Sequence, residues 1–388
     1  MNYIYCLIGL GLVSPPALWQ LLLSRKRHGQ NLCFLLSYAA LRYGTRIALS
    51  DGIRHLNFSD QYETVLRLSG VISKKIKNRN NAVVVIACRN TIDHILTLYA
   101  IKNLGIKLIV TNAKTSAAEL KRIAGDGYIF SSEATHLLLE NAINIDELSE
   151  GISNDHSKKI ISKKNGPVVF PTSGTTGTPR LVEKKTGAFY WVRALADLVA
   201  RTSIHQKQSV YISTPVSHMF GYTVLLFSLV LGKKIVTTDV KDPQWIAQLL
   251  QHEKVDLLTG VPASLYKIAE YLQQKKHSIN LIISNGAPFT RLVLEKVSSV
   301  LTNNIFSLYG STEASVSFIA DYSSLNNNVR ALGAPLAGVR YLLAPIPGGG
   351  KELLIQSPMV NVKADEWIRT GDLVDNEPNL YGDRKSVV

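Results

Sequence analysis

The sequence predicts an α/β fold whose largely parallel sheets are covered by helices on both faces. Short apolar segments alternate with longer segments of helical spacing, as where residues 82–87 are followed by residues 91–104. The chain has 388 residues, of which 46% are hydrophobic and 19% charged. This length and composition are those of a globular protein with a substantial core.

Each short apolar segment is interpreted as a buried strand, because strands of a parallel sheet that is covered on both faces are apolar throughout. The expected strands are residues 82–87, 107–111, 168–170, 210–213, 234–237, 255–258 and 279–284. The expected helices are residues 91–104, 117–124, 245–252 and 264–275. Strands and helices that alternate in this way favour parallel pairing. The polar stretch 153–164 is interpreted as a surface linker between two halves of the chain.

Composition excludes several classes of protein. Three cysteines without CxxC spacing argue against a disulfide scaffold or a zinc site and fit a reducing, cytoplasmic compartment. The nine histidines show no metal-ligand spacing. The formal charge is +14, but the basic residues occur in short scattered clusters without aromatic neighbours, so no nucleic-acid partner is expected. Polyanionic ligands such as nucleotides, an acidic protein or membrane surface, and solubility all remain as explanations of the charge.

Residues 1–30 form an apolar N-terminal extension. Residues 3–23 carry no charge and precede the basic stretch 24–28, so they could just span a bilayer and keep the rest of the chain cytoplasmic. The break at Ser14-Pro15-Pro16 divides this stretch into two shorter pieces. Three interpretations stay open: a membrane anchor or interfacial helix, a helix packed on the body, and a signal peptide. Membrane association through residues 1–23 would be at the cytoplasmic face.

A run of small polar residues follows the expected strand 168–170. Residues 172–180 read Thr-Ser-Gly-Thr-Thr-Gly-Thr-Pro-Arg. Glycines let backbone N–H groups approach an anion, and the hydroxyls add further donors. The spacing differs from a Walker A loop. Phosphate binding is one interpretation of this run, and a flexible turn is the other.

Four further motifs accompany this loop, and the five together resemble the adenylate-forming superfamily of acyl-CoA synthetases and related AMP-dependent ligases. The additional motifs are Pro-x-x-His-x-x-Gly at 215–221, Asn-Gly-Ala-Pro at 285–288, Tyr-Gly-x-Thr-Glu at 309–313 and Trp-x-x-Thr-Gly-Asp-Leu at 367–373. They occur in the family's order, and the similarity runs from about residue 31 to residue 388.

The resemblance implies a large adenylate-forming N-terminal domain over residues 31–382, with two parallel-rich sheets flanked by helices and a small β subdomain. It also implies ATP and Mg²⁺, with Glu313 and Thr176 as metal ligands. Tyr309 would stack on the adenine, and Asp372 would bind the ribose hydroxyls. The implied cofactor-binding residues are Thr172, Ser173, Gly174, Thr175, Thr176, Gly177, Arg180, Asn285, Gly286, Ala287, Tyr309, Gly310, Ser311, Thr312, Asp372 and Arg384; the implied catalytic residues are Thr176, His218 and Glu313.

The implied reaction is the activation of a carboxylic acid to acyl-AMP, with release of pyrophosphate. The acyl group then passes to a thiol, either of CoA or of the phosphopantetheine arm of an acyl carrier protein. His218 would line the acyl pocket near the reacting carboxylate. Residues 214–224 contain no acidic side chain that could pair with an α-ammonium group. A fatty or aryl acid therefore fits better than an amino acid.

Two departures from the family pattern matter. Arg180 stands where the family usually has lysine, and a guanidinium is no equivalent replacement for an ammonium. Residues 383–388 resemble the start of the hinge, so the small C-terminal domain is expected to be missing and a separate chain could supply it. Two alternatives to a complete enzyme follow. One is a non-catalytic module that binds nucleotide or acyl-adenylate, and the other is a membrane-tethered scaffold.

Overall fold

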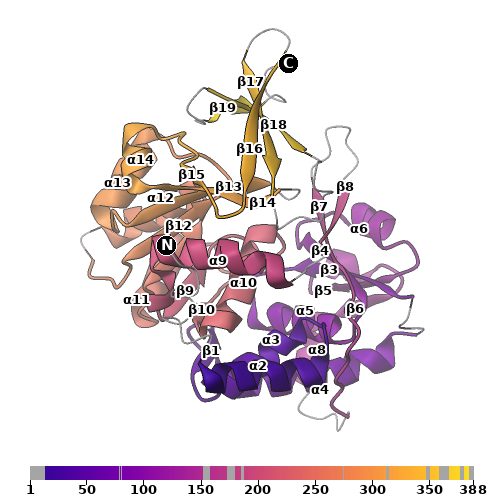
Figure 1. The fold of residues 1–388 in the computed structure, drawn as a ribbon. Coiled ribbons are helices and arrows are strands. Elements are labelled where there is room, and N and C mark those ends of the chain that lie inside the picture. Colours follow the sequence, from indigo (N-terminus) through magenta and orange to yellow (C-terminus); the bar gives the residue numbers. More distant parts are fainter. Residues whose placement is uncertain are drawn as a thin grey trace.

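Three β-sheets and the helices around them make up the computed structural model (Figure 1). It describes residues 14–77, 79, 81–151, 158–172, 180–184, 188–273, 275–311, 314–346, 350–357, 367–375 and 380–383. Two of the sheets are rich in parallel pairs, and the third is small and antiparallel. The predicted fold class is confirmed.

The first sheet has six strands in the order β6-β5-β3-β4-β7-β8. Its members are β3 (Val83–Cys88), β4 (Lys107–Asn112), β5 (Tyr128–Ser131), β6 (Ala142–Asn144), β7 (Val168–Thr172) and β8 (Arg180–Lys184). All neighbours pair in parallel except β7 and β8, which are antiparallel.

Both faces of this sheet are buried, which explains its continuous apolar strands. Val84 and Ile86 face the core that includes α4 (Phe58–Lys75) and α5 (Ile92–Asn103). The intervening Val85 and Ala87 face the other side, where α6 (Ala117–Ala124) packs through Leu120 and Ala124. Short helices α7 (Ala134–Leu137) and α8 (Ile145–Gly151) complete this half.

The second sheet has nine strands in the order β15-β14-β13-β12-β11-β9-β10-β1-β2. They are β1 (Ile47–Ser50), β2 (His55–Asn57), β9 (Ser209–Ile212), β10 (Lys234–Val236), β11 (Leu257–Gly260), β12 (Leu281–Asn285), β13 (Ile305–Ser311), β14 (Ser315–Asp321) and β15 (Ala334–Pro335). The six strands from β13 to β1 are parallel. Their carboxyl ends therefore share one edge.

Helices cover both faces of the nine-stranded sheet as well. One face carries α11 (Pro243–His252), α12 (Pro262–Leu272) and α13 (Arg291–Val300), which share a core with alternate strand residues such as Leu258 and Ile282. The other face carries α9 (Ala188–Thr202) and α10 (Met219–Leu231). The 3-10 helix η1 (Ile204–Gln206) precedes β9, and α14 (Tyr322–Asn327) follows β14.

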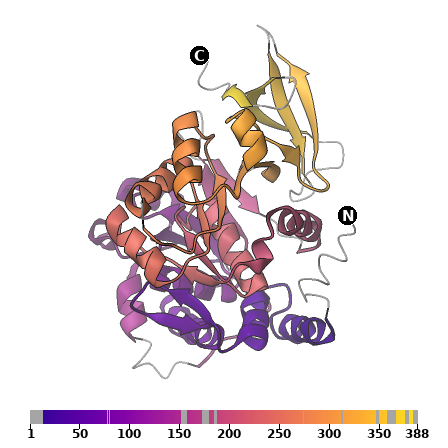
Figure 2. The same cartoon turned by 90° about the vertical axis from the view of Figure 1, so that its left-hand side faces the viewer.

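The third sheet is an antiparallel meander of β16 (Arg340–Pro345), β17 (Lys351–Gln356), β18 (Ile368–Val374) and β19 (Leu380–Asp383). It stands beyond the end of the nine-stranded sheet that carries β13 and β14 (Figure 2). Tyr341 of β16 packs edge-on against Phe318 of β14, with ring centroids 5.2 Å apart. This small sheet corresponds to the β subdomain that the motifs predicted.

At the N-terminus, α2 (Pro15–His28) and α3 (Cys33–Tyr43) pack against each other and against the body. Asn31, between them, donates hydrogen bonds to the carbonyls of Lys102, Asn103 and Lys164. Residues 1–13 lie outside the described part of the chain. No helix among the described residues is long and apolar enough to cross a membrane.

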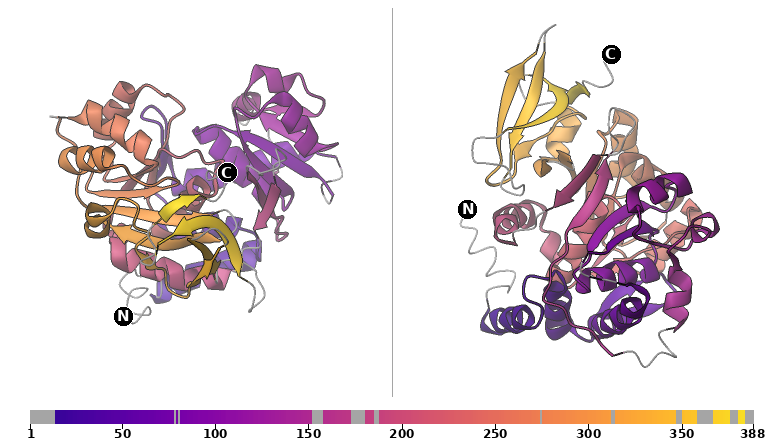
Figure 3. Two further views of the ribbon diagram at one scale, coloured as in Figure 1. Left: turned by 90° about the horizontal axis from the view of Figure 1, so that it is seen from above. Right: turned by 90° about the vertical axis from the view of Figure 1, so that its right-hand side faces the viewer.

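The prediction that residues 153–164 link two separate halves of the chain was wrong. Residues 158–164 form no helix or strand. However, β7 and β8, which follow this stretch in the sequence, belong to the six-stranded sheet. In turn, β1 and β2, which precede it, belong to the nine-stranded sheet. The two large sheets stand side by side when viewed from above (Figure 3). The chain therefore crosses between them more than once, and the predicted domain boundaries at residues 30 and 382 stay predictions.

Candidate active site

The predicted adenine turn lies at the carboxyl edge of the nine-stranded sheet, where ligands bind in open α/β sheets. Asn285 ends β12, and its side-chain amide donates to the carbonyl of Leu308 on β13, 2.8 Å away. Gly286 has a φ of +91°, a left-handed conformation that glycine adopts without steric cost. Gly286 and Ala287 are exposed, so the turn presents its backbone at this edge.

Tyr309 and Asp372 meet at the same edge. Tyr309 lies near the end of β13, and its hydroxyl donates a hydrogen bond to the Asp372 carboxylate on β18. Both residues are half-buried. The ring of Tyr309 packs edge-on against Phe318, with centroids 6.0 Å apart. One aromatic ring and one carboxylate, from motifs 63 residues apart, thus come together where the small sheet adjoins the large one.

Gly310 explains why the Tyr-Gly-x-Thr-Glu motif needs a glycine. A Cβ atom at Gly310 would lie 2.1 Å from the carbonyl oxygen of Ser315 on the antiparallel neighbour β14. The register between the two strands shifts at this point, and Ser315 has a φ of 58°. Only glycine permits this close approach. Ser311 accepts a hydrogen bond from the Ala314 amide, 3.0 Å away, and so closes the turn.

The Thr-Gly-Asp turn is held by a buried glutamate. Gly371 has a φ of +77°, and its amide donates to Oε1 of Glu352 at 3.2 Å. Thr370 donates its hydroxyl to the Leu353 carbonyl at 2.7 Å and accepts from the Asp372 amide at 3.1 Å. Glu352 is only 1% exposed and also pairs with Arg369. These bonds fix the backbone from which the Asp372 carboxylate projects.

Glu352 did not figure among the predicted site residues. The available signal was an acidic residue directly before the apolar run Leu353–Ile355, although burial of that residue could not be read from the sequence, because buried charges are rare unless they are paired.

His218 is the N-terminal capping residue of α10. Its amide donates to the carbonyl of Pro215 at 2.9 Å, which closes the turn before the helix. A Cβ at Gly221 would lie 2.5 Å from that same carbonyl oxygen. The spacing Pro-x-x-His-x-x-Gly therefore describes one compact turn and helix start. The His218 side chain is exposed, but the protein around it removes enough water to hold its pKa below the usual value.

Asn90, which sequence analysis missed, holds the segment that leads to His218. It follows β3 of the six-stranded sheet and is buried. Its Oδ1 accepts from the Val216 amide at 2.9 Å, and its amide donates to the carbonyls of Ile212 and Thr214. Thr237 donates its hydroxyl to the backbone carbonyl of Asn90. A buried asparagine just after an apolar strand was the signal, but its partners lie more than 120 residues away.

The predicted phosphate loop connects two antiparallel strands. Thr172 of β7 pairs with Arg180 of β8, so the two residues that bound the predicted loop in the sequence lie opposite each other. The remaining predicted phosphate, metal and ribose residues lie outside the described part of the chain. They are Ser173, Gly174, Thr175, Thr176, Gly177, Thr312, Glu313 and Arg384. Among described residues, no group of three or more histidines, cysteines or acids could hold a metal ion.

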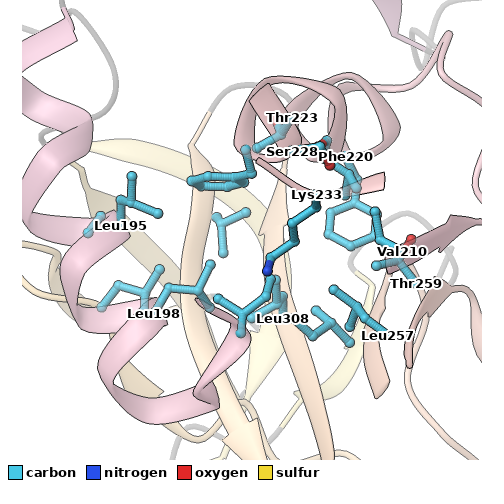
Figure 4. Close-up of a pocket in the computed structure, with 17 residues that line it drawn as sticks. Leu195, Leu198, Val210, Phe220, Thr223, Ser228, Lys233, Leu257, Thr259 and Leu308 are labelled. Carbon is cyan, nitrogen blue, oxygen red and sulfur yellow. The ribbon is translucent and has the colours of Figure 1, made fainter. Parts of the chain in front are cut away.

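An apolar cavity lies between α9, α10 and the nine-stranded sheet (Figure 4). Phe220, two residues after His218, lines it together with Leu198 and Leu308. Lys233, between α10 and β10, also lines it, and its ammonium donates to the backbone carbonyl of Lys207. Burial lowers the pKa of Lys233 to about 8. His218 is not among the described residues that line it.

The family described as AMP-binding enzyme matches residues 36–358. The chain belongs to this family, in agreement with the prediction from the five motifs, and the prediction that it is an enzyme of the AMP-forming class is confirmed.

Curated relatives that align with most of this chain include 2-succinylbenzoate–CoA ligases. That of Listeria monocytogenes is 22% identical over 87% of this chain and 76% of the ligase. That of Bacillus subtilis is 23% identical over 88% of this chain and 75% of the ligase.

Solved structures share the fold. O-succinylbenzoate coenzyme A synthetase from Bacillus subtilis, in complex with ATP and magnesium ion, has a TM-score of 0.77 at 21% identity, over 91% of this chain and 80% of that one. The N-terminal domain of FACL13 from Mycobacterium tuberculosis also has a TM-score of 0.77, at 17% identity, over 91% of this chain and 98% of that domain.

Proposed function

We propose that this protein joins a carboxylic acid to AMP at the expense of ATP and passes the acyl group to a thiol. The observation that carries the proposal is the contact between Tyr309 and Asp372 beside the turn at residues 285–287. An aromatic ring, a carboxylate and an exposed backbone turn are the groups that bind a nucleoside, and they lie where nucleotides bind in α/β sheets.

These residues fit the nucleoside part of ATP. The Tyr309 ring offers a stacking face for adenine. Asp372 offers its two carboxylate oxygens to the ribose hydroxyls. One of these oxygens, Oδ2, also accepts the hydrogen bond from the Tyr309 hydroxyl. The loop at 173–177 would hold the phosphates with its amides and hydroxyls. When bound through Glu313 and Thr176, Mg²⁺ would neutralise phosphate charge.

The proposed chemistry has two steps. A carboxylate oxygen of the acid attacks the α-phosphorus of ATP, and the bond to the bridging oxygen of the β-phosphate breaks, so that acyl-AMP and pyrophosphate form. A thiolate sulfur then attacks the acyl carbon, and AMP leaves with the electrons of the broken C–O bond. Positioning and charge neutralisation supply most of the catalysis in such transfers.

His218 would act on the acid rather than on ATP. Its lowered pKa favours the neutral imidazole, which can donate a hydrogen bond to the substrate carboxylate. Asn90 would act through backbone position, because it fixes residues 212–216 ahead of His218.

A fatty or aryl acid is the proposed substrate class. The cavity beside α10 is apolar where Phe220, Val224 and Leu308 line it. The volume of this cavity is about 40 Å³, so an aryl or alkyl group could enter it only if the lining side chains moved apart. The named relatives act on 2-succinylbenzoate, an aryl acid, which supports an aryl or alkyl group over an amino acid. Because these relatives are named as CoA ligases, CoA is the first candidate for the thiol that accepts the acyl group, and an acyl carrier protein is the second.

The test is exchange of labelled pyrophosphate into ATP with the full chain, in the presence of a panel of fatty, aryl and amino acids. We expect exchange with at least one apolar acid and none with amino acids. Thioester formation is then followed with CoA and with a holo acyl carrier protein in parallel.

Calorimetry with a non-hydrolysable acyl-sulfamoyl adenosine separates binding from turnover. Tight binding without exchange for any acid would contradict the proposed activity and favour a non-catalytic module that binds the adenylate. Absence of both binding and exchange would contradict the nucleotide site itself.

A further inference from the structure

Helix α2 exposes three of its large apolar side chains, whereas Leu21 and Leu23 are half-buried. Leu18, Trp19 and Leu22 are 42%, 63% and 63% exposed. The residues that α2 buries are Ala17, Ser24 and His28, which are small or polar. A surface helix of a soluble protein normally has the opposite arrangement, with its large apolar residues toward the core.

Specific contacts hold α2 in this orientation. The Gln20 amide donates to the Leu41 carbonyl of α3 at 3.2 Å. His28 shares a hydrogen bond of 2.9 Å with the Tyr62 hydroxyl of α4. The Arg25 guanidinium lies 5.9 Å from the centre of the Phe34 ring. Because these contacts anchor the inner side and the last turn, the outward direction of Trp19 and Leu22 is a fixed property of the fold.

Positive charge gathers at the C-terminal end of this apolar face. Arg25, Lys26 and Arg27 in the last turn of α2 are all exposed. The exposed Lys163 adjoins the end of the helix, since a Cβ at Gly29 would lie 3.3 Å from its Cβ. The first acidic residue of the whole chain is Asp51. An apolar stripe with cations beside it and no nearby acid in the sequence matches an anionic surface with an apolar interior.

The helix is too short to span a bilayer. Its 14 residues measure about 21 Å at 1.5 Å per residue, against a hydrocarbon core of about 30 Å. Three exposed side chains also cover far less than the roughly 800 Å² per partner that a stable protein interface buries. Insertion of a few apolar side chains among anionic headgroups needs no such area.

We propose that α2 lies in the plane of an anionic membrane surface, with Leu18, Trp19 and Leu22 inserted among the lipids and the exposed Lys26 against the headgroups. This inference rests on α2 alone and holds whether or not the proposed ligase activity does.

The test is co-sedimentation of the full chain with vesicles of phosphatidylcholine alone and of equimolar phosphatidylcholine and phosphatidylserine. We expect binding to the anionic vesicles, weaker binding at high salt, and little binding to the neutral ones. Trp19→Gln combined with Leu22→Gln should reduce binding about tenfold or more. Trp19→Phe should largely keep it, since it preserves the apolar contact.

The control for the apolar variant is Leu292→Gln, at an exposed apolar residue of α13 (67% exposed). A second test variant is Lys26→Gln, and its control is Lys241→Gln. The controls should bind as the wild type does, and Lys26→Gln should bind more weakly to anionic vesicles. Circular dichroism and thermal unfolding verify that each variant is folded. Unchanged vesicle binding by the Trp19→Gln, Leu22→Gln variant, or a wild-type chain that stays in the supernatant, would overturn the proposal.

Discussion

At the residue scale, the hydroxyl of Tyr309 and the carboxylate of Asp372 tie the small antiparallel sheet to the nine-stranded one. The sequence could predict both residues, because each stands in a motif with a distinctive neighbour. It could not predict that they touch, since the contact depends on how two sheets meet. Glu352 was missed for a related reason: its role rests on hydrogen bonds to a turn 19 residues further along the chain.

The first prediction concerns this pair. Asp372→Ala should weaken ATP binding by about tenfold or more, because a charge-assisted hydrogen bond contributes about 1.5–3 kcal/mol. Tyr309→Phe keeps the stacking ring and should weaken binding only a few-fold. Isothermal titration calorimetry measures both. Tyr341→Phe, which changes another half-buried tyrosine next to Phe318, serves as the control and should bind ATP normally. Normal binding by Asp372→Ala would argue against a ribose site here.

The second prediction concerns Lys233. Burial lowers its pKa from 10.5 to about 8, so between these values the unfolded chain binds more protons than the folded one. Folding stability due to this group therefore rises with pH from about 8 to 10.5, by about 3 kcal/mol in total. Lys233→Met removes that dependence. In urea unfolding, the wild type should gain stability relative to Lys233→Met as pH rises through this window.

The control for Lys233 is Lys241→Met, at a surface position whose side chain is 74% exposed. Because other titrating groups cancel in each comparison with the wild type, only the Lys233 difference should vary with pH. A constant difference between the wild type and Lys233→Met from pH 8 to 10.5 would show that the ammonium is not destabilised by burial.

At the element scale, the sequence predicted best the helices and strands whose ends are set by neighbouring residues in the sequence. Helix α6 was predicted at its observed bounds, 117–124, and Ser116 caps its first turn. Strand β11 was predicted two residues early, because Val255 is apolar but closes the turn after α11 by donating to Leu250. The β7–β8 hairpin and the entry of β1 into the later sheet depend on distant pairing, which no local pattern encodes.

The third prediction concerns the loop between β9 and α10. Asn90→Ala should lower the free energy of unfolding by about 2 kcal/mol, because it leaves the buried Val216 amide without its acceptor. If Asn90 positions His218, the KM for the acid should rise more than the KM for ATP. Denaturant unfolding and steady-state kinetics measure these effects. Asn304→Ala, which loses one hydrogen bond at the surface, is the control and should change neither KM. Equal changes in both KM values would reduce Asn90 to a purely structural role.

At the scale of the whole molecule, alternating apolar and amphipathic segments were sufficient to predict parallel-rich sheets covered by helices, while the number of such sheets came from the resemblance to the family. The assignment of strands to sheets was not predictable, because the chain crosses between the sheets twice. That crossing matters for function. Asn90 from the six-stranded sheet holds residues 212–216 of the nine-stranded one, and Asp372 reaches Tyr309 from the small sheet. The candidate site is therefore assembled from all three sheets.

The central claim is that the acid's own oxygen attacks the α-phosphorus of ATP. Its most direct test uses an apolar acid labelled with ¹⁸O in both carboxylate oxygens, incubated with ATP and CoA. Mass spectrometry of the nucleotide product should find one labelled oxygen in AMP and none in pyrophosphate. Unlabelled AMP, or label in inorganic phosphate, would contradict the account, because the acid would then not have formed an acyl-adenylate.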